Sequence, residues 1–484
     1  MSLRSVITYA AAATLVGVYA AQSAHAQALA APADQTAQAA PADQSAAPPP
    51  PPKHPIWSGT PLGDIQFSGH TEVGLSINPD GPKNNANFGQ PFTNGADAFR
   101  MNQTMLDVEH DTDSTQNFDY GFRFQGFYGT DARLTHFYNE WDRATNSPYQ
   151  WDINYLEGNI HSSIPGTSGV DIQIGEYATP LGYEVIDSTG NPFYSHSYIF
   201  TYGLPYKHTG ILGTFHVNDT IDVWAGWDTG VNDSFVGAHG NVNGSILHGI
   251  VGFGLNNLVG GNLTIIGLAH IGPENPAGSA IINTTTGASH GFDVDSSLVE
   301  YYDANAVWKI TDALTSVTEV NMVHNDAYSV TAGGAAQYIL YTLNDQWTLG
   351  ARAEAFADQA KNGFAGFVCN FPGSQDAVDG ERNIPFSNAN TRNPVGNQAY
   401  CGSGSSAKIG TPYNAVYGEV TVGATYTPTW PPLPGTWGLA IRPEARFDTI
   451  IGGSGHVDPY DVGSSGHGTK SSQVTLAVDA TLSF

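Results

Sequence analysis

The fold is decided by the last twelve residues of the chain, 473–484, which read QVTLAVDATLSF. Every second residue from Val474 to Phe484 is apolar, and most of the residues between them are small or polar. Successive side chains of a β-strand point to opposite faces, so the segment predicts a strand with one apolar and one polar face. About ten residues of strand are enough to cross a lipid bilayer at a tilt. The segment is therefore either a membrane-spanning strand or an ordinary amphipathic strand that ends the chain.

Similar stretches of strand length recur through most of the chain. In residues 117–128, four aromatic residues from Phe118 to Phe124 alternate with residues that include Asp119 and Arg123. Three stretches, near 98–110, 296–309 and 313–323, slip phase once, which leaves the direction of their faces open. We predict about sixteen strands, at roughly 63–77, 98–111, 117–128, 150–161, 168–176, 207–217, 221–228, 245–256, 261–271, 295–309, 313–323, 334–344, 347–356, 411–426, 437–448 and 473–484.

The gaps between these stretches alternate in length. Long gaps such as 177–206 and 357–410 follow odd-numbered stretches, and short gaps such as Asn218-Asp219 follow even-numbered ones. The gap 324–333 is short for its place, and 427–436 is long. A closed barrel in an outer membrane has short periplasmic turns and long extracellular loops. Because lipid offers no partner for backbone polar groups, strands cross it only in a sheet that closes on itself.

These patterns together predict an all-β fold, a closed antiparallel transmembrane β-barrel of about sixteen strands. A barrel of that size leaves an aqueous channel rather than a packed interior. The composition agrees, with 56 Gly, 23 Tyr, 22 Phe and 9 Trp, and only 13% charged residues. Soluble domains average about 25% charged residues.

The chain is strongly acidic, with 17 Lys and Arg against 44 Asp and Glu and a formal net charge of -27. This balance excludes nucleic acid as a partner, because binding to phosphates needs a basic surface. An acidic lumen would attract cations. Acidic loops that merely keep an extracellular surface hydrated explain the balance equally well.

The two ends of the chain differ in character. Residues 1–26 hold a basic start, an apolar run and an A-x-A-type site at Ala24-His25-Ala26, which predicts a secretory signal peptide. Residues 27–62 are rich in Ala and Pro and predict a disordered periplasmic spacer. The barrel domain is expected over 63–484, placed in the bacterial outer membrane after export through the periplasm.

Two cysteines, Cys369 and Cys401, lie in a polar stretch that is rich in Gly, Asn and Ser. An exported chain meets an oxidising compartment, so we expect one disulfide that closes a long surface loop. A metal-binding role is disfavoured because no His or second Cys pair lies at ligand spacing.

The region after the fifth predicted strand carries three motifs: TPLGYE at 179–184, SHSY at 195–198 and HTG at 208–210. With the signal peptide, the strand pattern and the terminal Phe484, they resemble the OmpL-like putative beta-barrel porins of Gram-negative outer membranes, over most of the chain after residue 62. The resemblance implies passive diffusion of small solutes through the outer membrane. His196 departs from the family pattern, in which a basic residue commonly lies between the two serines.

The long gap 177–206 lies where sixteen-strand porins fold a loop into the lumen. Acidic side chains on such a loop, facing basic side chains on the wall, would set a transverse field across a constriction. The alternative is that these are unrelated charges, each solvated. The candidates for the constriction or lumen are Glu176, Glu184, Asp187, His196, Lys207, Arg123, Arg352, Arg442 and Arg446.

We therefore expect a porin that favours cations. It should work without a cofactor or metal, and we do not expect it to be an enzyme. Its sixteen His are scattered singly, and the sequence holds no Gly-x-Ser-x-Gly and no His-Glu-x-x-His. Expected partners are outer-membrane lipids, small solutes and ions, and the barrel-assembly machinery, which would read the terminal Phe484. A homotrimer is expected from the architecture alone.

Three alternatives remain open at this point. The first is a substrate-specific channel, for example for sugars, in which inward aromatic residues form a path: Trp224, Phe127 and Tyr417. The second is an outer-membrane barrel hydrolase. The third is a receptor or adhesin that binds through its loops, with 357–410 as the candidate segment.

Overall fold

The computed structural model describes residues 54–55, 65–83, 85–137, 148–231, 234, 248–273, 281–282, 289–290, 298–326, 330–358, 415–429, 437–453, 458–461 and 469–484. The predicted signal peptide, almost all of the spacer and both cysteines lie outside these residues. The signal peptide and the disulfide between Cys369 and Cys401 therefore stay predictions.

Sixteen long strands form within the described residues, and they match the sixteen predicted stretches one for one. They are β2 (Gln66–Ile77), β3 (Asp97–His110), β4 (Phe118–Gly129), β5 (Gln150–Ser162), β6 (Gly169–Ala178), β7 (Lys207–Asn218), β8 (Ile221–Asp228), β9 (Gly249–Asn257), β10 (Leu263–Gly272), β13 (Val299–Thr311), β14 (Leu314–Asn325), β15 (Val330–Asn344), β16 (Trp347–Asp358), β17 (Ala415–Tyr426), β18 (Gly438–Gly453) and β19 (Ser472–Ser483).

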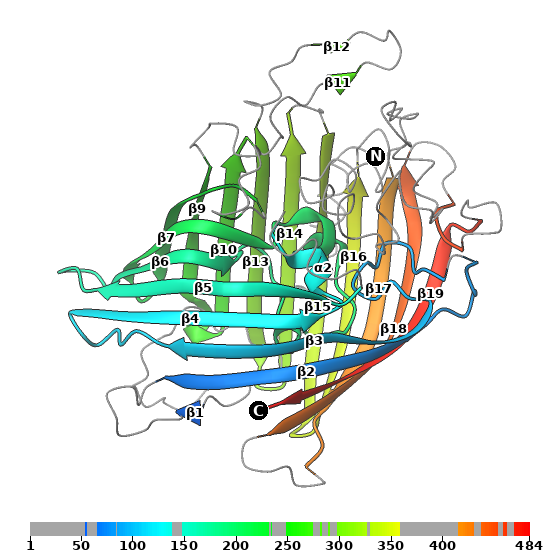
Figure 1. Ribbon diagram of the computed structural model, residues 1–484, viewed down its shortest axis with the longest axis horizontal. Coiled ribbons are helices and arrows are strands. Elements are labelled where there is room, and N and C mark those ends of the chain that lie inside the picture. Colours follow the sequence, from blue (N-terminus) through cyan, green and yellow to red (C-terminus); the bar gives the residue numbers. More distant parts are fainter. Residues whose placement is uncertain are drawn as a thin grey trace.

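The sheet closes on itself. Each long strand pairs antiparallel with the next along the chain, and β19 pairs with β2, as in the pair Leu476 and Ile77. Figure 1 shows this closure, with blue β2 beside red β19. The closed sixteen-strand antiparallel barrel predicted from the sequence is thus confirmed. A two-residue strand within the predicted spacer, β1 (His54–Pro55), adds to β2, and β11 (Ile281–Ile282) pairs with β12 (Ser289–His290).

The two faces of each strand follow the predicted alternation. On β4, Phe118 and Tyr120 are 63% and 70% exposed, whereas the inward Gln125 is buried. On β19, Val474 and Leu476 are exposed and Asp479 is buried. An apolar outer belt of this kind suits contact with lipid, and the polar residues line the interior.

The three stretches with a phase slip have physical explanations. In β3, the register against β2 shifts at Asn102, and Asn102 and Gln103 are both buried, as expected for a bulge. In β13 and β14, apolar side chains such as Tyr301 and Val317 point inward and are buried. They belong to a large hydrophobic cluster inside the barrel, so an inward apolar face only looks like a slipped phase in the sequence.

The connections alternate as expected. β14 ends at Asn325 and β15 begins at Val330, whereas β17 ends at Tyr426 and β18 begins at Gly438, so the short gap and the long gap that depart from the alternation both lie between strands of the barrel. One short connection contains the turn α3 (Leu258–Gly261). Within the described residues, no helix has the length and apolar character needed to span a membrane.

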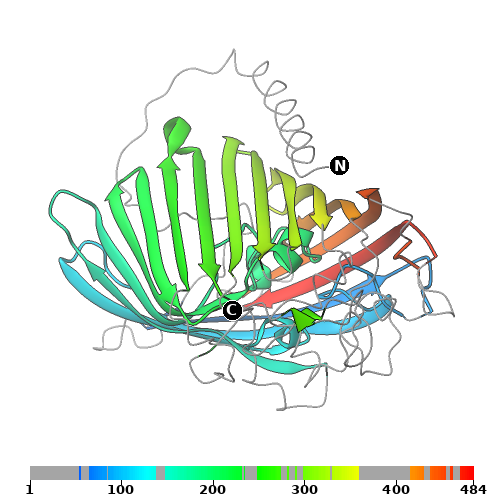
Figure 2. The ribbon, with the colours of Figure 1, turned by 90° about the horizontal axis from the view of Figure 1, so that it is seen from above.

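The connection between β6 and β7 enters the barrel. It holds two short helical turns, η2 (Ser188–Gly190) and η3 (Ile199–Gly203), and most of its residues are buried. Figures 1 and 2 show its coil within the ring of strands, near α2 (Ala132–Thr135). The backbone N–H of Thr179 donates to the carbonyl of Tyr206, which joins the two ends of the connection. We call residues 179–206 the inward segment.

Candidate functional site

Carboxylates of the barrel wall hold the backbone of the inward segment. Glu444 accepts the N–H groups of Tyr194 and Ser195, at 2.9 and 3.2 Å. Glu354 accepts those of Tyr198 and Ile199, at 2.6 and 2.7 Å. Because the segment has no neighbouring strand, these wall side chains satisfy buried backbone donors that would otherwise destabilise it.

Two further strands add anchors of the same kind. Asp303 on β13 accepts the N–H of Gly182 at 3.1 Å, and Glu319 on β14 accepts the N–H of Tyr183 at 2.9 Å. Asn321 donates to the carbonyl of Gly203 at 3.0 Å. The segment is therefore held along its length rather than at its two ends alone.

Three wall arginines, Arg352 on β16 and Arg442 and Arg446 on β18, donate hydrogen bonds to backbone carbonyls of the same segment. Arg442 donates to the carbonyls of Ser188 and Asn191, at 2.8 and 2.7 Å. Arg446 donates to the carbonyl of His196 at 2.5 Å. Each arginine also pairs with wall carboxylates, Arg442 with Asp479 for example. Such charge-assisted bonds are among the stronger hydrogen bonds in proteins.

Glu184 connects the inward segment both to the barrel wall and to a later part of the segment itself. Its Oε1 accepts from Arg352 at 2.7 Å and from the Tyr338 hydroxyl at 2.9 Å. Its Oε2 lies 2.9 Å from His196 Nδ1 and accepts the N–H of Ser197 at 3.0 Å. Burial alone would raise the pKa of Glu184, but Arg352, His196 and the Ser197 bond outweigh it and lower this pKa to about 2.

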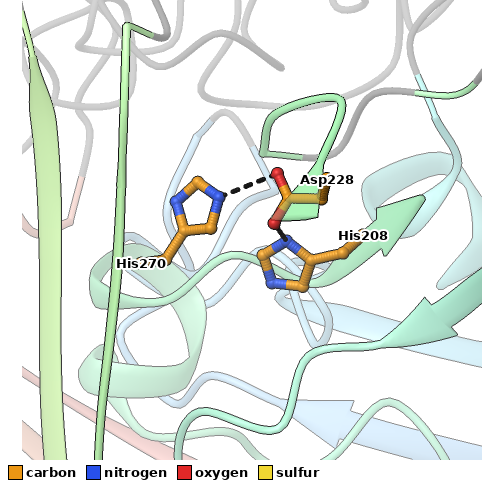
Figure 3. Close-up of side chains that lie close together, drawn as sticks. All are labelled: His208, Asp228 and His270. Atoms are coloured by element: carbon orange, nitrogen blue, oxygen red, sulfur yellow. Dashed lines mark hydrogen bonds and ion pairs between the residues drawn. The ribbon is translucent and has the colours of Figure 1, made fainter. Parts of the chain in front are cut away.

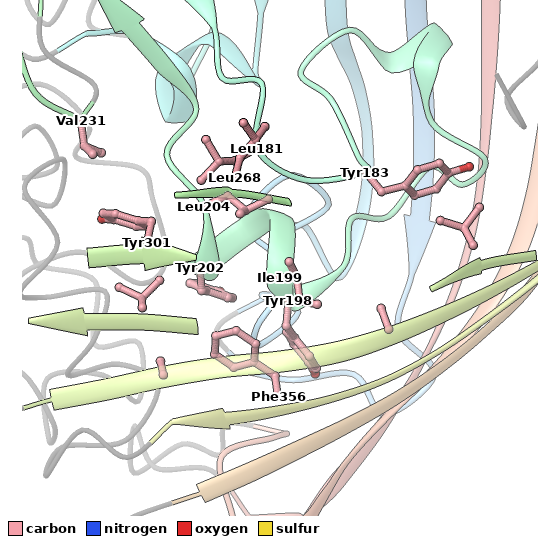
Figure 4. Packing of buried hydrophobic residues seen from close by; sticks show 14 of the residues in the cluster. Leu181, Tyr183, Tyr198, Ile199, Tyr202, Leu204, Val231, Leu268, Tyr301 and Phe356 are labelled. Atoms are coloured by element: carbon pink, nitrogen blue, oxygen red, sulfur yellow. The ribbon is translucent and has the colours of Figure 1, made fainter. Parts of the chain in front are cut away.

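Aromatic residues of the segment pack into the barrel. Figure 4 shows Tyr183, Tyr198, Ile199 and Tyr202 of the segment in one cluster with wall residues that include Phe356. A Cβ at Gly74 of β2 would lie 2.2 Å from Tyr194 Cζ, so only glycine leaves room for this ring. Gly350 of β16 makes similar room for Phe193, at 2.9 Å.

Two other long connections pack against the inward segment. Phe92, between β2 and β3, lies 4.5 Å from the ring of His196 and 5.6 Å from that of Phe200, between ring centroids. Gln90 donates to Asp448 on the wall at 2.7 Å. Arg133 of α2 donates to the carbonyl of Pro91 at 3.0 Å, which links the connections to each other.

We use two names for the inner surface of the barrel. The covered wall consists of the inward charged residues on β13–β18 that bind the inward segment or pair with a residue that does: Asp303, Glu319, Arg352, Glu354, Glu419, Arg442, Glu444, Arg446 and Asp448. The open wall consists of eight inward charged residues near the short-turn ends of β3–β8: Asp107, Glu109, Arg123, Glu157, His161, Asp171, His216 and Asp222.

The open wall contains the more accessible charges. The side chains of Asp171, Arg123 and His216 are 35%, 28% and 18% exposed, whereas that of Arg352 is fully buried. His216 bridges Asp171 and Asp222, at 2.9 and 2.6 Å. These groups lie close to the short-turn end of the barrel, because each is within a few residues of a short connection.

Asp187 of the inward segment is linked to Arg123 of the open wall through Gln125 and Asp107. Asp187 caps η2 by accepting the N–H of Thr189 at 2.9 Å, and its side chain stays 27% exposed. Arg123 makes a bidentate contact with Asp107 and lies 4.0 Å over the ring of Tyr155. Gln125 donates both to Asp107 and to Asp187, at 2.9 and 3.3 Å, and so connects the segment to the wall.

The transverse field expected between acids of the loop and arginines of the wall needs correction for Glu184 and Arg352. These two groups are in direct contact and buried, so they form an ion pair that anchors the segment rather than two poles across a water-filled gap. Among the described residues, Asp187 on the loop and Arg123 on the wall still fit the predicted arrangement, because their side chains are 27% and 28% exposed.

The other candidates have local partners. Lys207 Nζ binds Asp152 and donates to the carbonyl of Ile153 at 2.7 Å. Glu176 is separate from the lumen set, because register pairs it with the exposed Leu156 on the outer face, where Ser234 donates to it at 3.0 Å.

The aromatic path considered for a sugar channel is not continuous. Phe127 and Tyr417 are both inward, as predicted, but they are buried in two different hydrophobic clusters. Trp224 is partly buried beside the cluster that contains Tyr417.

Sequence reasoning missed the acidic anchors of the segment. Asp303, Glu319 and Glu354 occupy inward strand positions, and their spacing shows only that they face the lumen. Inward acids on several strands of one half of the barrel were the available signal. The hydrogen-bonded backbone groups lie more than a hundred residues away in the chain, so no local pattern reveals the contact.

Comparison with known proteins identifies relatives at the level of family and architecture. The profile of the family described as "Putative beta-barrel porin-2, OmpL-like" matches residues 64–484. No curated protein matches the chain.

Solved structures similar to this chain include an anion-selective porin and an outer membrane channel. The anion-selective porin from Comamonas acidovorans has 9% identity and a TM-score of 0.47, with 87% of this chain and 99% of that one covered. OprB of Pseudomonas putida has 9% identity and a TM-score of 0.47, with 87% and 94% covered. The channel DcaP of Acinetobacter baumannii has 11% identity and a TM-score of 0.46, with 87% and 97% covered.

Proposed function

Because this chain belongs to the OmpL-like beta-barrel porin-2 family of the bacterial outer membrane, we propose that it forms a water-filled channel for passive diffusion of small hydrophilic solutes and favours cations. The family match supports a porin. The preference for cations is our own inference from the charges of the lumen.

The observation that carries this preference is the charge of the open wall. Among the described residues, its five carboxylates and the neighbouring Asp187 outnumber Arg123, His161 and His216, even with both imidazoles protonated. The side chains of Asp171 and Asp187 are 35% and 27% exposed, so their negative charges act on a passing ion. A lumen with an excess of one charge concentrates ions of the opposite sign.

The covered wall has a different role in this proposal. Its arginines are paired with carboxylates and bound to the inward segment, so their charge is neutralised locally. We infer that the covered wall fixes the position of the segment and hence the size of the channel. It contributes little to ion selectivity, although it contains three arginines.

The test is single-channel recording of refolded protein in a planar lipid bilayer under a KCl gradient. We expect stepwise conductance with a reversal potential on the cation-selective side. Folded protein that gives no conductance would refute the channel, and an anion-selective reversal potential would refute the charge argument while retaining the channel.

Homotrimer assembly and recognition of Phe484 by the assembly machinery stay proposals; Phe484 pairs through its backbone with Gly69.

A further inference from the structure

Three residues from separate strands meet inside the barrel near the start of the inward segment. They are His208 on β7, Asp228 on β8 and His270 on β10, and all three side chains are fully buried. Figure 3 shows the two oxygens of Asp228 directed at the two imidazole rings. None of these residues belongs to the open or the covered wall.

The distances suit a single metal ion. His208 Nδ1 lies 3.4 Å from Asp228 Oδ2, and His270 Nε2 lies 3.0 Å from Asp228 Oδ1. One ligand atom from each residue falls within 4.8 Å of the others. An ion bound tetrahedrally at about 2.0–2.1 Å keeps its ligand atoms roughly 3.3 Å apart, which is close to both nitrogen-to-carboxylate distances.

The surroundings of the triad orient its ligands. His208 Nε2 lies 3.0 Å from Thr179 Oγ1, so this nitrogen can donate there while Nδ1 faces the ion. Asp228 Oδ1 also accepts the N–H of Gly230 at 2.9 Å. Hydrogen bonds of this kind to the far side of a ligand are a regular feature of metal sites in proteins.

The donor set selects among metals. Two imidazoles and one carboxylate suit Zn²⁺, whereas Ca²⁺ and Mg²⁺ prefer sites made wholly of oxygen ligands. A divalent cation also compensates the buried charge of Asp228 with both imidazoles neutral, and a buried carboxylate needs such compensation. We propose that His208, Asp228 and His270 supply three ligands of a zinc site, with water in the fourth position, and that the bound ion fixes the start of the inward segment through Thr179.

This proposal does not depend on conduction and revises the expectation, drawn from scattered histidines, that the protein holds no metal. The experiment is to refold the full chain with Zn²⁺, remove loosely bound metal with a chelating resin, and measure zinc per chain by mass spectrometry. We expect about one zinc per chain. Co²⁺ in place of Zn²⁺ should give the visible absorption of a four-coordinate site.

His270→Gln and Asp228→Asn are the test variants, and His216→Gln is the matched control because it removes a lumen histidine that contacts two carboxylates. We expect zinc affinity to fall by at least tenfold in the test variants and to be unchanged in the control. Absence of zinc from folded wild-type protein would overturn the proposal. Equal losses in His216→Gln and His270→Gln would also overturn it, and the cobalt spectrum of the wild type tests it even if the variants fail to fold.

Discussion

The covered and open walls of this barrel are both rich in charged residues, but they differ in how those residues are exposed and paired. Arg352 of the covered wall is fully buried and contacts Glu184, Glu419 and the carbonyl of Ser195. Arg123 of the open wall is 28% exposed and pairs with Asp107. The same residue type on the same kind of inward position thus holds a segment in one region and faces water in the other.

This difference shows that the charge facing a lumen cannot be counted from the sequence alone. A buried charge in contact with an opposite charge exerts little net field on an ion in the channel. A partly exposed charge exerts a larger one. The covered wall should therefore respond to mutation mainly through stability and channel size, and the open wall mainly through selectivity.

The largest effect is expected from Arg352→Ala in the covered wall. The substitution leaves Glu184 and Glu419 buried without their guanidinium partner, and removing one partner of a buried pair costs about 3–5 kcal/mol. Denaturant unfolding in detergent micelles should show this loss, and recordings should show larger and noisier currents. Unchanged stability would mean that the ion pair does not anchor the segment.

A smaller effect is expected where the segment packs on a glycine. Gly74→Val places side-chain atoms where Tyr194 lies, and overpacking of this kind costs about 1–3 kcal/mol. Gly158→Val is the matched control, since a Cβ there meets nothing within 4 Å. If both variants lose the same stability in denaturant unfolding, the packing of Tyr194 is not the cause.

The pH dependence of current noise separates the anchor from bulk titration. The pKa of Glu184 is lowered from its ordinary 4.5 to about 2, so its stabilising contribution is complete above about pH 4.5 and is lost as the pH falls toward 2. Recordings should therefore stay quiet down to about pH 4.5 and begin to flicker below it. Glu184→Gln should flicker at every pH, and flicker that starts above pH 5 in the wild type would contradict this assignment.

The smallest change in stability is expected from Arg123→Ala in the open wall. Its own side chain is 28% exposed, and its partner Asp107 keeps a hydrogen bond from Gln125, so the loss should be about 1 kcal/mol or less. The reversal potential should move further toward cation selectivity because a positive charge is removed. A loss of stability as large as that of Arg352→Ala would erase the distinction between the two walls.

Much of the barrel follows from local patterns. Alternation gave the outer faces of β4 and β19, because lipid and water impose opposite demands on neighbouring side chains. The alternation broke where an inward residue such as Val317 packs on the inward segment instead of meeting water. An interior contact between distant parts of the chain has no local signature, so those strands were ambiguous.

The site was predictable only in part, for the same reason. Position and alternation placed Glu184 on an inward loop and Arg352 on the wall, but only the packed structure shows that they touch. His208, Asp228 and His270 lie on three strands with other residues between them, and each appeared as a single polar residue. Their meeting depends on the register of β7, β8, β9 and β10.

The most direct test of the central claim compares one carboxylate from each region. Asp171→Asn and Glu184→Gln each remove a single negative charge with little change of shape, from a side chain that is 35% exposed and from one that is 1% exposed. Single-channel reversal potentials under one KCl gradient should show weaker cation selectivity in Asp171→Asn and no shift in Glu184→Gln. A larger shift in Glu184→Gln than in Asp171→Asn would contradict the account, because the buried pair would then control which ions pass.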